Sequence, residues 1–213
     1  MSLTILVTGF GPFPGAAFNP TRSMAIRLAR LRRPALSDVK IIAHVFPTSY
    51  AAVDRELPLL VARHKPQAML MFGLAPRARA VRVETRARNA VALLPDADGI
   101  SIRRNVIAPG RPASVPLRTP VRPLLAALRT ACAVNPSRDA GRYLCNYLCW
   151  RVSDLAADRH GPKTLAFIHV PPVRRGARRK GPTRQRRKAM PSIDNLVAAA
   201  GRALVAIVAE ARR

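Results

Sequence analysis

Acidic residues are scarce in this sequence. Only 11 aspartates and glutamates stand against 37 lysines and arginines in 213 residues, which gives a formal net charge of +26. Such an excess attracts polyanions in a salt-dependent way and would suit a nucleic-acid-binding protein. The charge is mostly arginine and spreads along the chain, with one dense run at 174–188. Because that run has no interleaved aromatic residues for base stacking, we expect a solvated basic loop and no specific nucleic-acid partner. Binding of polyanions or nucleic acid through the run stays an alternative.

Long hydrophobic runs are absent as well. No stretch of 18 apolar, uncharged residues occurs, which excludes an ordinary transmembrane helix. The first residues, MSLTILVTGFGPF, lack the basic start and the cleavage site of a signal peptide, and their short apolar part ends in turn residues. We therefore expect a strand there, a cytoplasmic protein and no membrane partner.

Cysteine and aromatic residues are few. Three cysteines, an odd number without a secretion signal, argue against a disulfide framework. Cys145 and Cys149 stand one helical turn apart, but no histidine lies near them to complete a zinc pattern, so we predict no metal site. Aromatic residues make up 5% of a chain that is 49% hydrophobic, so the core must be mainly aliphatic.

The apolar patterns alternate between strand and helix and predict a single α/β domain over residues 1–213. Such alternation is typical of a three-layer α/β/α sandwich with a mostly parallel central sheet. The helix that contains Pro58 should be kinked. We expect strands at 3–8, 40–46, 67–72 and 164–170, a strand end at 142–144, an extended pair or hairpin at 81–94, a turn-rich and mobile loop at 95–116, and helices starting at 20 and spanning 51–63, 121–133, 146–157 and 192–212.

Three groups with catalytic chemistry fall near predicted strand ends, where sites of α/β proteins collect. Cys145 follows the expected strand end and opens a helix, His169 ends a buried strand, and Glu84 lies in the extended segment. A helix N-terminus stabilises a thiolate, a histidine can take the thiol proton, and a carboxylate can orient that histidine. Each residue alone also fits a purely structural role, and spacing does not show that the three meet.

Four motifs occur in order along the chain: TGFGPFPGAAFNPT at 8–21, VRVETRARN at 81–89, DAGRYLCN at 139–146 and AFIHVP at 166–171. Together they resemble the pyroglutamyl peptidase I family of cysteine peptidases over nearly the whole chain. The resemblance implies removal of N-terminal pyroglutamyl residues from peptides, without metal or cofactor. It further implies a triad of Glu84, Cys145 and His169 and a thioester acyl-enzyme.

The same resemblance implies a substrate pocket. A small, flat, uncharged ring needs apolar walls and a few placed polar groups. Backbone N–H groups of Cys145 and Asn146 would form the oxyanion site. Asn19 would also cap the helix that begins at Pro20. The residues expected around the ring are Phe10, Phe13, Asn19, Thr48, Leu74, Tyr143 and Leu144.

The chain departs from the family's pattern at several points. Leu74 stands where a glutamine is common, Thr85 stands where an arginine is common, and a basic stretch follows His169, whereas Asn89 is kept. These departures put substrate preference in doubt more than reaction type. They leave open a diverged relative that acts on another acylated peptide. A homo-oligomer, dimer or tetramer, is compatible with the resemblance, although the high charge opposes close association.

Overall fold

A six-stranded sheet forms the centre of the molecule in this computed structural model, which describes residues 2–129, 132–174 and 190–213. Neighbouring strands are parallel except at one junction, where β4 runs antiparallel to β8. The order across the sheet is β2 (Val39–Phe46), β1 (Leu3–Phe10), β3 (Ala68–Leu74), β8 (Thr164–Val170), β4 (Val81–Glu84) and β7 (Val134–Ser137).

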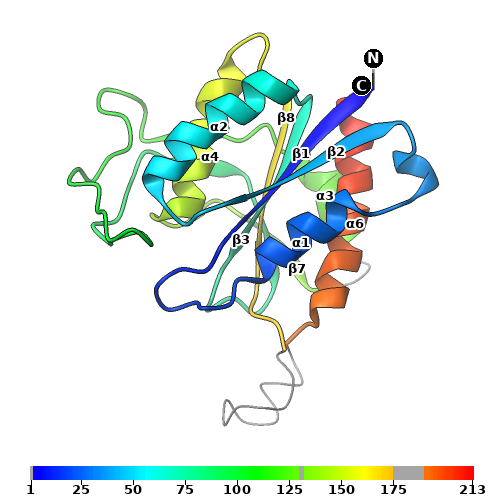
Figure 1. Ribbon diagram of the computed structural model, residues 1–213, viewed down its shortest axis with the longest axis horizontal. Coiled ribbons are helices and arrows are strands. Elements are labelled where there is room, and N and C mark those ends of the chain that lie inside the picture. Colours follow the sequence, from blue (N-terminus) through cyan, green and yellow to red (C-terminus); the bar gives the residue numbers. More distant parts are fainter. Residues whose placement is uncertain (1, 130–131, 175–189) are drawn as a thin grey trace.

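Helices cover both faces of this sheet (Figure 1). One face carries α1 (Pro20–Ala29), α3 (Val121–Arg129) and α6 (Ile193–Ala211), and the other carries α2 (Tyr50–His64) and α4 (Leu144–Ala157). A short 3₁₀ helix (Pro34–Leu36) and a separate two-stranded sheet of β5 (Arg86–Arg88) and β6 (Ser114–Pro116) complete the described elements. The predicted three-layer α/β/α sandwich is confirmed.

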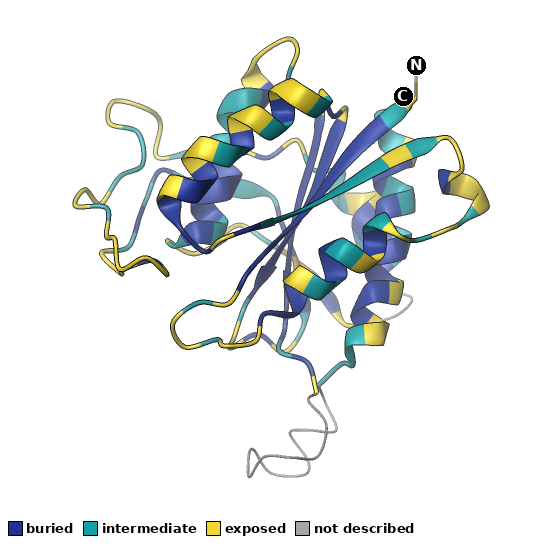
Figure 2. Ribbon diagram, viewed as in Figure 1, coloured by how far each residue is buried: buried dark blue, intermediate teal, exposed yellow. Residues whose placement is uncertain are grey.

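Two hydrophobic cores lie between the layers, and Figure 2 shows the central strands buried between the helices. Alternate residues of one strand enter different cores because side chains on a strand alternate between its faces. On β1, for example, Ile5 and Val7 join the core under α1 and α6, whereas Leu6 joins the core under α2 and α4. Strands β3 and β8 are buried along their whole length, as expected for central strands.

The segment expected to form a hairpin is divided between two sheets. Strand β4 pairs with β7 and β8, whereas β5 pairs with β6. Strands β4 and β5 therefore do not pair with each other. Thr85 marks the division, because its N–H donates to the Ser137 carbonyl while its own carbonyl accepts from Leu117 N. The branched residues predicted the extended backbone correctly, but they carry no information about which strand is the partner.

The strand end expected at 142–144 is wrong. Gly141 adopts φ +85°, Tyr143 is the extended N-cap residue, and Leu144 is already the first residue of α4. The nearby strand is β7, which contains Pro136 and which the sequence does not predict. Proline is tolerated there because β7 is an edge strand of the sheet.

Helix α2 includes Pro58 in its interior. Helix α3 is described over Val121–Arg129, and the expected end at residue 133 stays a prediction because residues 130–131 lie outside the described ranges. The basic run at 174–188 lies outside the described residues apart from Arg174, whose N–H donates to the Pro191 carbonyl at 3.0 Å.

Candidate active site

A buried carboxylate–histidine pair lies on the sheet where β4 and β8 meet. The antiparallel register pairs Arg82 with His169 and Glu84 with Phe167, so Glu84 and His169 are diagonal neighbours on one face. Glu84 Oε1 is 2.8 Å from His169 Nδ1. The side chains are 0% and 8% exposed, respectively. The carboxylate therefore fixes the orientation of the imidazole and directs its other nitrogen away from Glu84.

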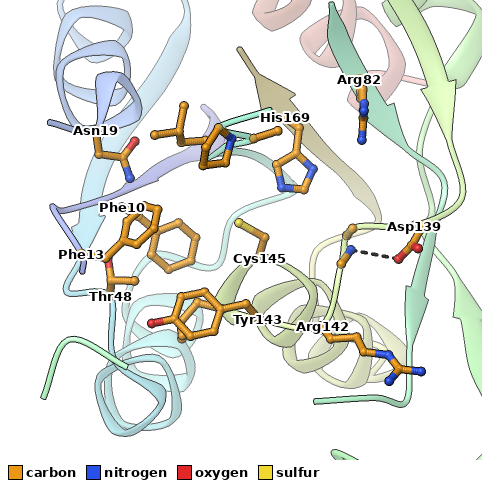
Figure 3. Close-up of a pocket in the computed structure, with 16 residues that line it drawn as sticks. Phe10, Phe13, Asn19, Thr48, Arg82, Asp139, Arg142, Tyr143, Cys145 and His169 are labelled. Carbon is orange, nitrogen blue, oxygen red and sulfur yellow. Dashed lines mark hydrogen bonds between the residues drawn. The ribbon is translucent and has the colours of Figure 1, made fainter. Parts of the chain in front are cut away.

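Cys145 is the second residue of α4 and lies in the first helical turn. The N–H groups of a first turn have no acceptor within the helix, and the helix dipole adds partial positive charge at that end. No side-chain oxygen caps α4 among the residues that the structure describes. Figure 3 shows the Cys145 side chain in the pocket, between the aromatic residues and the His169 ring. The free N–H groups and the helix dipole can therefore stabilise negative charge that develops on an atom at this end of α4.

Gly73 brings the sulfur close to the sheet. This residue of β3 pairs with His169 of β8, and a Cβ atom at residue 73 would lie 2.6 Å from Cys145 Sγ and 2.8 Å from the Phe167 ring. The sulfur therefore packs against bare backbone directly beside the strand that carries His169. The sequence showed Gly73 only as the end of a strand, and its role depends on a contact between β3 and α4.

Electrostatics also couple the histidine to the cysteine. Burial lowers the pKa of His169, but the negative charge of Cys145 and the hydrogen-bonded Glu84 carboxylate outweigh it and raise that pKa to about 9. The imidazole is therefore protonated near neutral pH. Burial, together with the charges of Cys145 and Glu84, raises the pKa of Cys149 well above its ordinary value. Burial likewise raises the pKa of Cys132, so these two thiols stay protonated.

A pocket of about 360 Å³ opens in front of Cys145 and His169. Every residue that the sequence predicted to surround the ring lines it, whereas Glu84 lies behind His169 and Asn146 is not part of the wall. The lining residues are Phe10, Phe13, Asn19, Thr48, Leu74, Ala75, Pro76, Arg82, Asp139, Ala140, Gly141, Arg142, Tyr143, Leu144, Cys145 and His169.

Aromatic rings form one wall of this pocket. Phe13 and Tyr143 approach with ring centroids 6.3 Å apart, and Tyr50 packs edge-on against Tyr143 at 6.0 Å. The Tyr143 hydroxyl donates to the Pro95 carbonyl at 3.0 Å, which fixes the ring from outside. Phe10 is buried and also belongs to the core under α2 and α4. The wall is thus apolar and held in place at several points.

Asn19 and Thr48 hold the loop that carries Phe13. The Asn19 amide and the Thr48 hydroxyl both donate to the Gly11 carbonyl, at 3.0 and 3.1 Å. Asn19 Oδ1 accepts from Thr21 N at 3.1 Å, which confirms its predicted role as the N-cap of α1. These side chains line the pocket and at the same time set its shape.

Asn146 has a structural role that sequence reasoning missed. Its side chain accepts from Arg88 N at 2.8 Å and donates to the carbonyls of Arg88 and Ala90 at 2.8 and 2.9 Å. The Asn146 side chain therefore ties α4 to β5. The backbone N–H of Asn146 takes no part in these contacts and belongs to the first turn of α4.

The turn-rich segment after β5 is tied down at Asp96. This carboxylate is buried and accepts from the backbone N–H groups of Tyr50, Asp98 and Ile100 at 2.9, 3.0 and 2.9 Å. It holds the chain beside Pro95, the acceptor of the Tyr143 hydroxyl. The expected loop near the site is present, and its inner part supports the aromatic wall.

Sequence reasoning missed one whole side of the pocket. Arg82, Asp139 and Arg142 line it at the end away from the aromatic wall (Figure 3). Arg82 stands two residues before Glu84 and Arg142 three before Cys145, so both lie inside the motifs that drew attention to the triad. Their charges gave no separate signal in a chain with so many arginines.

Comparison with known proteins agrees with the geometry of this pocket. The family model described as pyroglutamyl peptidase matches residues 3–210. The chain belongs to the pyroglutamyl peptidase family. A pyrrolidone-carboxylate peptidase of Pyrococcus furiosus is 32% identical over 171 residues, covering 79% of this chain and 81% of the relative. One from Gloeobacter violaceus is 33% identical, with 79% and 82% covered.

Solved structures of the family have the same fold. The pyrrolidone carboxyl peptidase of Thermococcus litoralis superposes with a TM-score of 0.87 at 27% identity, covering 99% of this chain and 96% of that one. Within the described ranges, no group of three histidine, cysteine or acidic side chains is placed to hold a metal ion. No helix of the described chain is long and apolar enough to span a bilayer.

Proposed function

We propose that this protein is a cysteine peptidase that hydrolyses the amide bond after an N-terminal pyroglutamyl residue. Cys145 is the nucleophile, His169 the general acid and base, and Glu84 the residue that orients His169. The observation that carries the proposal is the buried Glu84–His169 pair beside Cys145, whose sulfur has room only because residue 73 is glycine. Membership of the pyroglutamyl peptidase family supports the choice of substrate.

The reaction begins with the Cys145 thiolate attacking the exocyclic carbonyl carbon of the pyroglutamyl residue. A C–S bond forms, and the carbonyl oxygen becomes an oxyanion that backbone N–H groups of Cys145 and Asn146 at the start of α4 stabilise. The C–N bond then breaks, and His169 donates its proton to the leaving amine, which gives a thioester. The pKa of about 9 keeps His169 protonated for this step.

Water completes the cycle. His169, now neutral, takes a proton from water, and the resulting hydroxide attacks the thioester carbon. The C–S bond breaks, pyroglutamic acid leaves, and the thiolate and imidazolium are restored. Glu84 supports the positive imidazolium of the resting enzyme, which is the state restored at the end of the cycle. This is the role expected for a buried carboxylate behind a catalytic histidine.

The pocket suits a small neutral ring. Phe10, Phe13 and Tyr143 provide apolar contact, and its volume of about 360 Å³ lies at the lower end of the range for small-molecule sites. Leu74 adds an apolar side chain to the lining, so polar recognition of the lactam falls to backbone groups and to Asn19 and Thr48.

Hydrolysis of a fluorogenic pyroglutamyl amide by the purified full chain in reducing buffer tests the proposal. Wild type should release the fluorophore, Cys145→Ala and His169→Ala should not, and Cys132→Ala, outside the pocket, should match wild type. A folded wild type that releases nothing, while iodoacetamide labels Cys145 first, would favour the alternative of a relative acting on another acyl group. Faster labelling of Cys132 or Cys149 would show that the nucleophile is misassigned.

The other expectations about cellular context stay predictions. We infer action in the cytoplasm on pyroglutamylated peptides, without a specific nucleic-acid partner, and self-association as a dimer or tetramer. Sedimentation of the purified chain measures whether it self-associates as a dimer or tetramer. Filter binding across a salt series tests nucleic-acid affinity, which should vanish at high salt if it arises only from the net charge of +26.

A further inference from the structure

The pocket has two chemically different ends, with Cys145 and His169 between them (Figure 3). At one end lie Phe10, Phe13, Asn19 and Thr48. The opposite end is lined by Arg82, Asp139 and Arg142. The neutral pyroglutamyl ring fits the aromatic end. Since the sulfur attacks the carbonyl that joins the ring to the peptide, the leaving amine and the residue that carries it extend toward the charged end.

The charge at that end is positive. Arg82 and Arg142 are exposed, and neither makes an ion pair with a carboxylate anywhere in the described ranges. Asp139 is already engaged, because its Oδ2 lies 3.0 Å from Arg88 Nη1 and its Oδ1 accepts from Gly141 N at 3.0 Å. Neither guanidinium is therefore occupied by a carboxylate of the described residues, and the two lie on separate sides of this end of the pocket, with the Arg142 side chain directed outward (Figure 3).

We propose that Arg82 and Arg142 form a carboxylate-binding subsite for the residue that follows pyroglutamate, so that the enzyme prefers acidic substrates at this position. The inference rests on the proposed function and specifies its substrate class. A guanidinium group matches a carboxylate through paired N–H donors. Arg82 is the register partner of His169, and Arg142 precedes Cys145 by three residues, so both flank the site of bond cleavage.

A carboxylate at this place has two sources: the side chain of aspartate or glutamate, or the terminal carboxylate of a dipeptide. Comparing kcat/KM for pyroglutamyl-glutamate amide and pyroglutamyl-glutamine amide isolates the side chain, because the two are nearly the same size. Comparing pyroglutamyl-alanine with its amide isolates the terminus. We expect the acidic member of at least one pair to be preferred about twofold to fivefold at low salt, the range of exposed ion pairs.

Arg82→Gln and Arg142→Gln should each bring this ratio toward one, and the double variant should remove it. Arg122→Gln is the matched control, since Arg122 is exposed on α3, which packs in the core on the other face of the sheet. It should keep the wild-type ratio. Added salt of about 0.5 M should reduce the wild-type preference, because it screens exposed charges beyond a few ångströms.

Three results would overturn the inference. The first is a wild-type ratio at or below one for both pairs. The second is a ratio that survives in the double variant or that falls equally in Arg122→Gln, which would assign it to the overall charge. The third is a folded wild type that fails to cleave pyroglutamyl-glutamine amide, which would also refute the proposed function. Cleavage of that neutral amide without any acidic preference refutes the subsite alone.

Discussion

Replacing Gly73 by alanine tests the geometry of the site most directly. The added Cβ would lie 2.6 Å from Cys145 Sγ and 2.8 Å from the Phe167 ring. Ordinary non-bonded contacts between heavy atoms are about 3.5–4.0 Å, so the sulfur must move by about 1 Å. A displacement of about 1 Å at a reacting atom can cost about 100-fold in rate. Overpacking against Phe167 should also lower the free energy of unfolding by about 1–3 kcal/mol.

The assay follows kcat/KM on a fluorogenic pyroglutamyl amide together with urea denaturation. We expect Gly73→Ala to lose about 100-fold in activity while it stays folded, and to change the iodoacetamide reactivity of Cys145. Gly11→Ala is the matched control at the same end of the sheet, because its Cβ meets nothing closer than the Phe46 carbonyl at 3.7 Å. Activity of Gly73→Ala within about threefold of wild type would refute the placement of the sulfur between β3 and His169.

Four further predictions concern the groups around the nucleophile. The pKa of His169 should drop from about 9 in Cys145→Ala, because the charge of Cys145 is the largest influence that raises it; a histidine NMR titration measures this. The folded-state pKa of His169 lies above the ordinary 6.5, so its protonation stabilises the fold fully below pH 6.5. This contribution to the free energy of unfolding should be lost as pH rises through 9. Denaturation of wild type and His169→Gln across this pH range measures it. Glu84→Gln should reduce kcat about 100-fold with little change in KM. A rise in KM by a similar factor would argue for a packing role of Glu84 instead. Asp96→Ala should lower stability by about 1–3 kcal/mol and raise KM through the Tyr143 wall, whereas the exposed Asp98→Ala should change neither.

The sequence predicted the layers of the fold because they depend on local apolar patterns, whereas the pocket residues it named followed from the family resemblance and left out the charged side. Apolar periodicity identified the long central strands and helices, and the capping residue Asn19 marked the start of α1. Periodicity did not predict β7, an edge strand that contains a proline, and it failed at residues 142–144, where the apolar start of a helix looks like a strand. Short elements such as these are decided by their neighbours in space.

The contacts that make the site work were beyond sequence reasoning for the same reason. Gly73 matters only because α4 meets β3 there, and the Asn146 side chain only because β5 lies beside α4. The motifs indicated that Glu84, Cys145 and His169 belong together through resemblance, whereas the residues themselves gave no evidence of their convergence. The structure supplies that evidence as a pairing register and as distances between side chains.

The reversal of direction between β8 and β4 explains how one short strand serves two purposes. In the antiparallel register, Arg82 lies opposite His169, and Glu84 lies opposite Phe167, one step deeper in the sheet. Both side chains are on the face that carries His169, yet Arg82 is exposed and Glu84 is fully buried. A parallel β4 would end at the pocket edge and expose its last residue to water, which would weaken the hold of Glu84 on the imidazole. The antiparallel strand instead keeps the carboxylate that contacts His169 dry and presents a cation at the mouth, so the proposed mechanism and the proposed choice of the following residue both depend on β4.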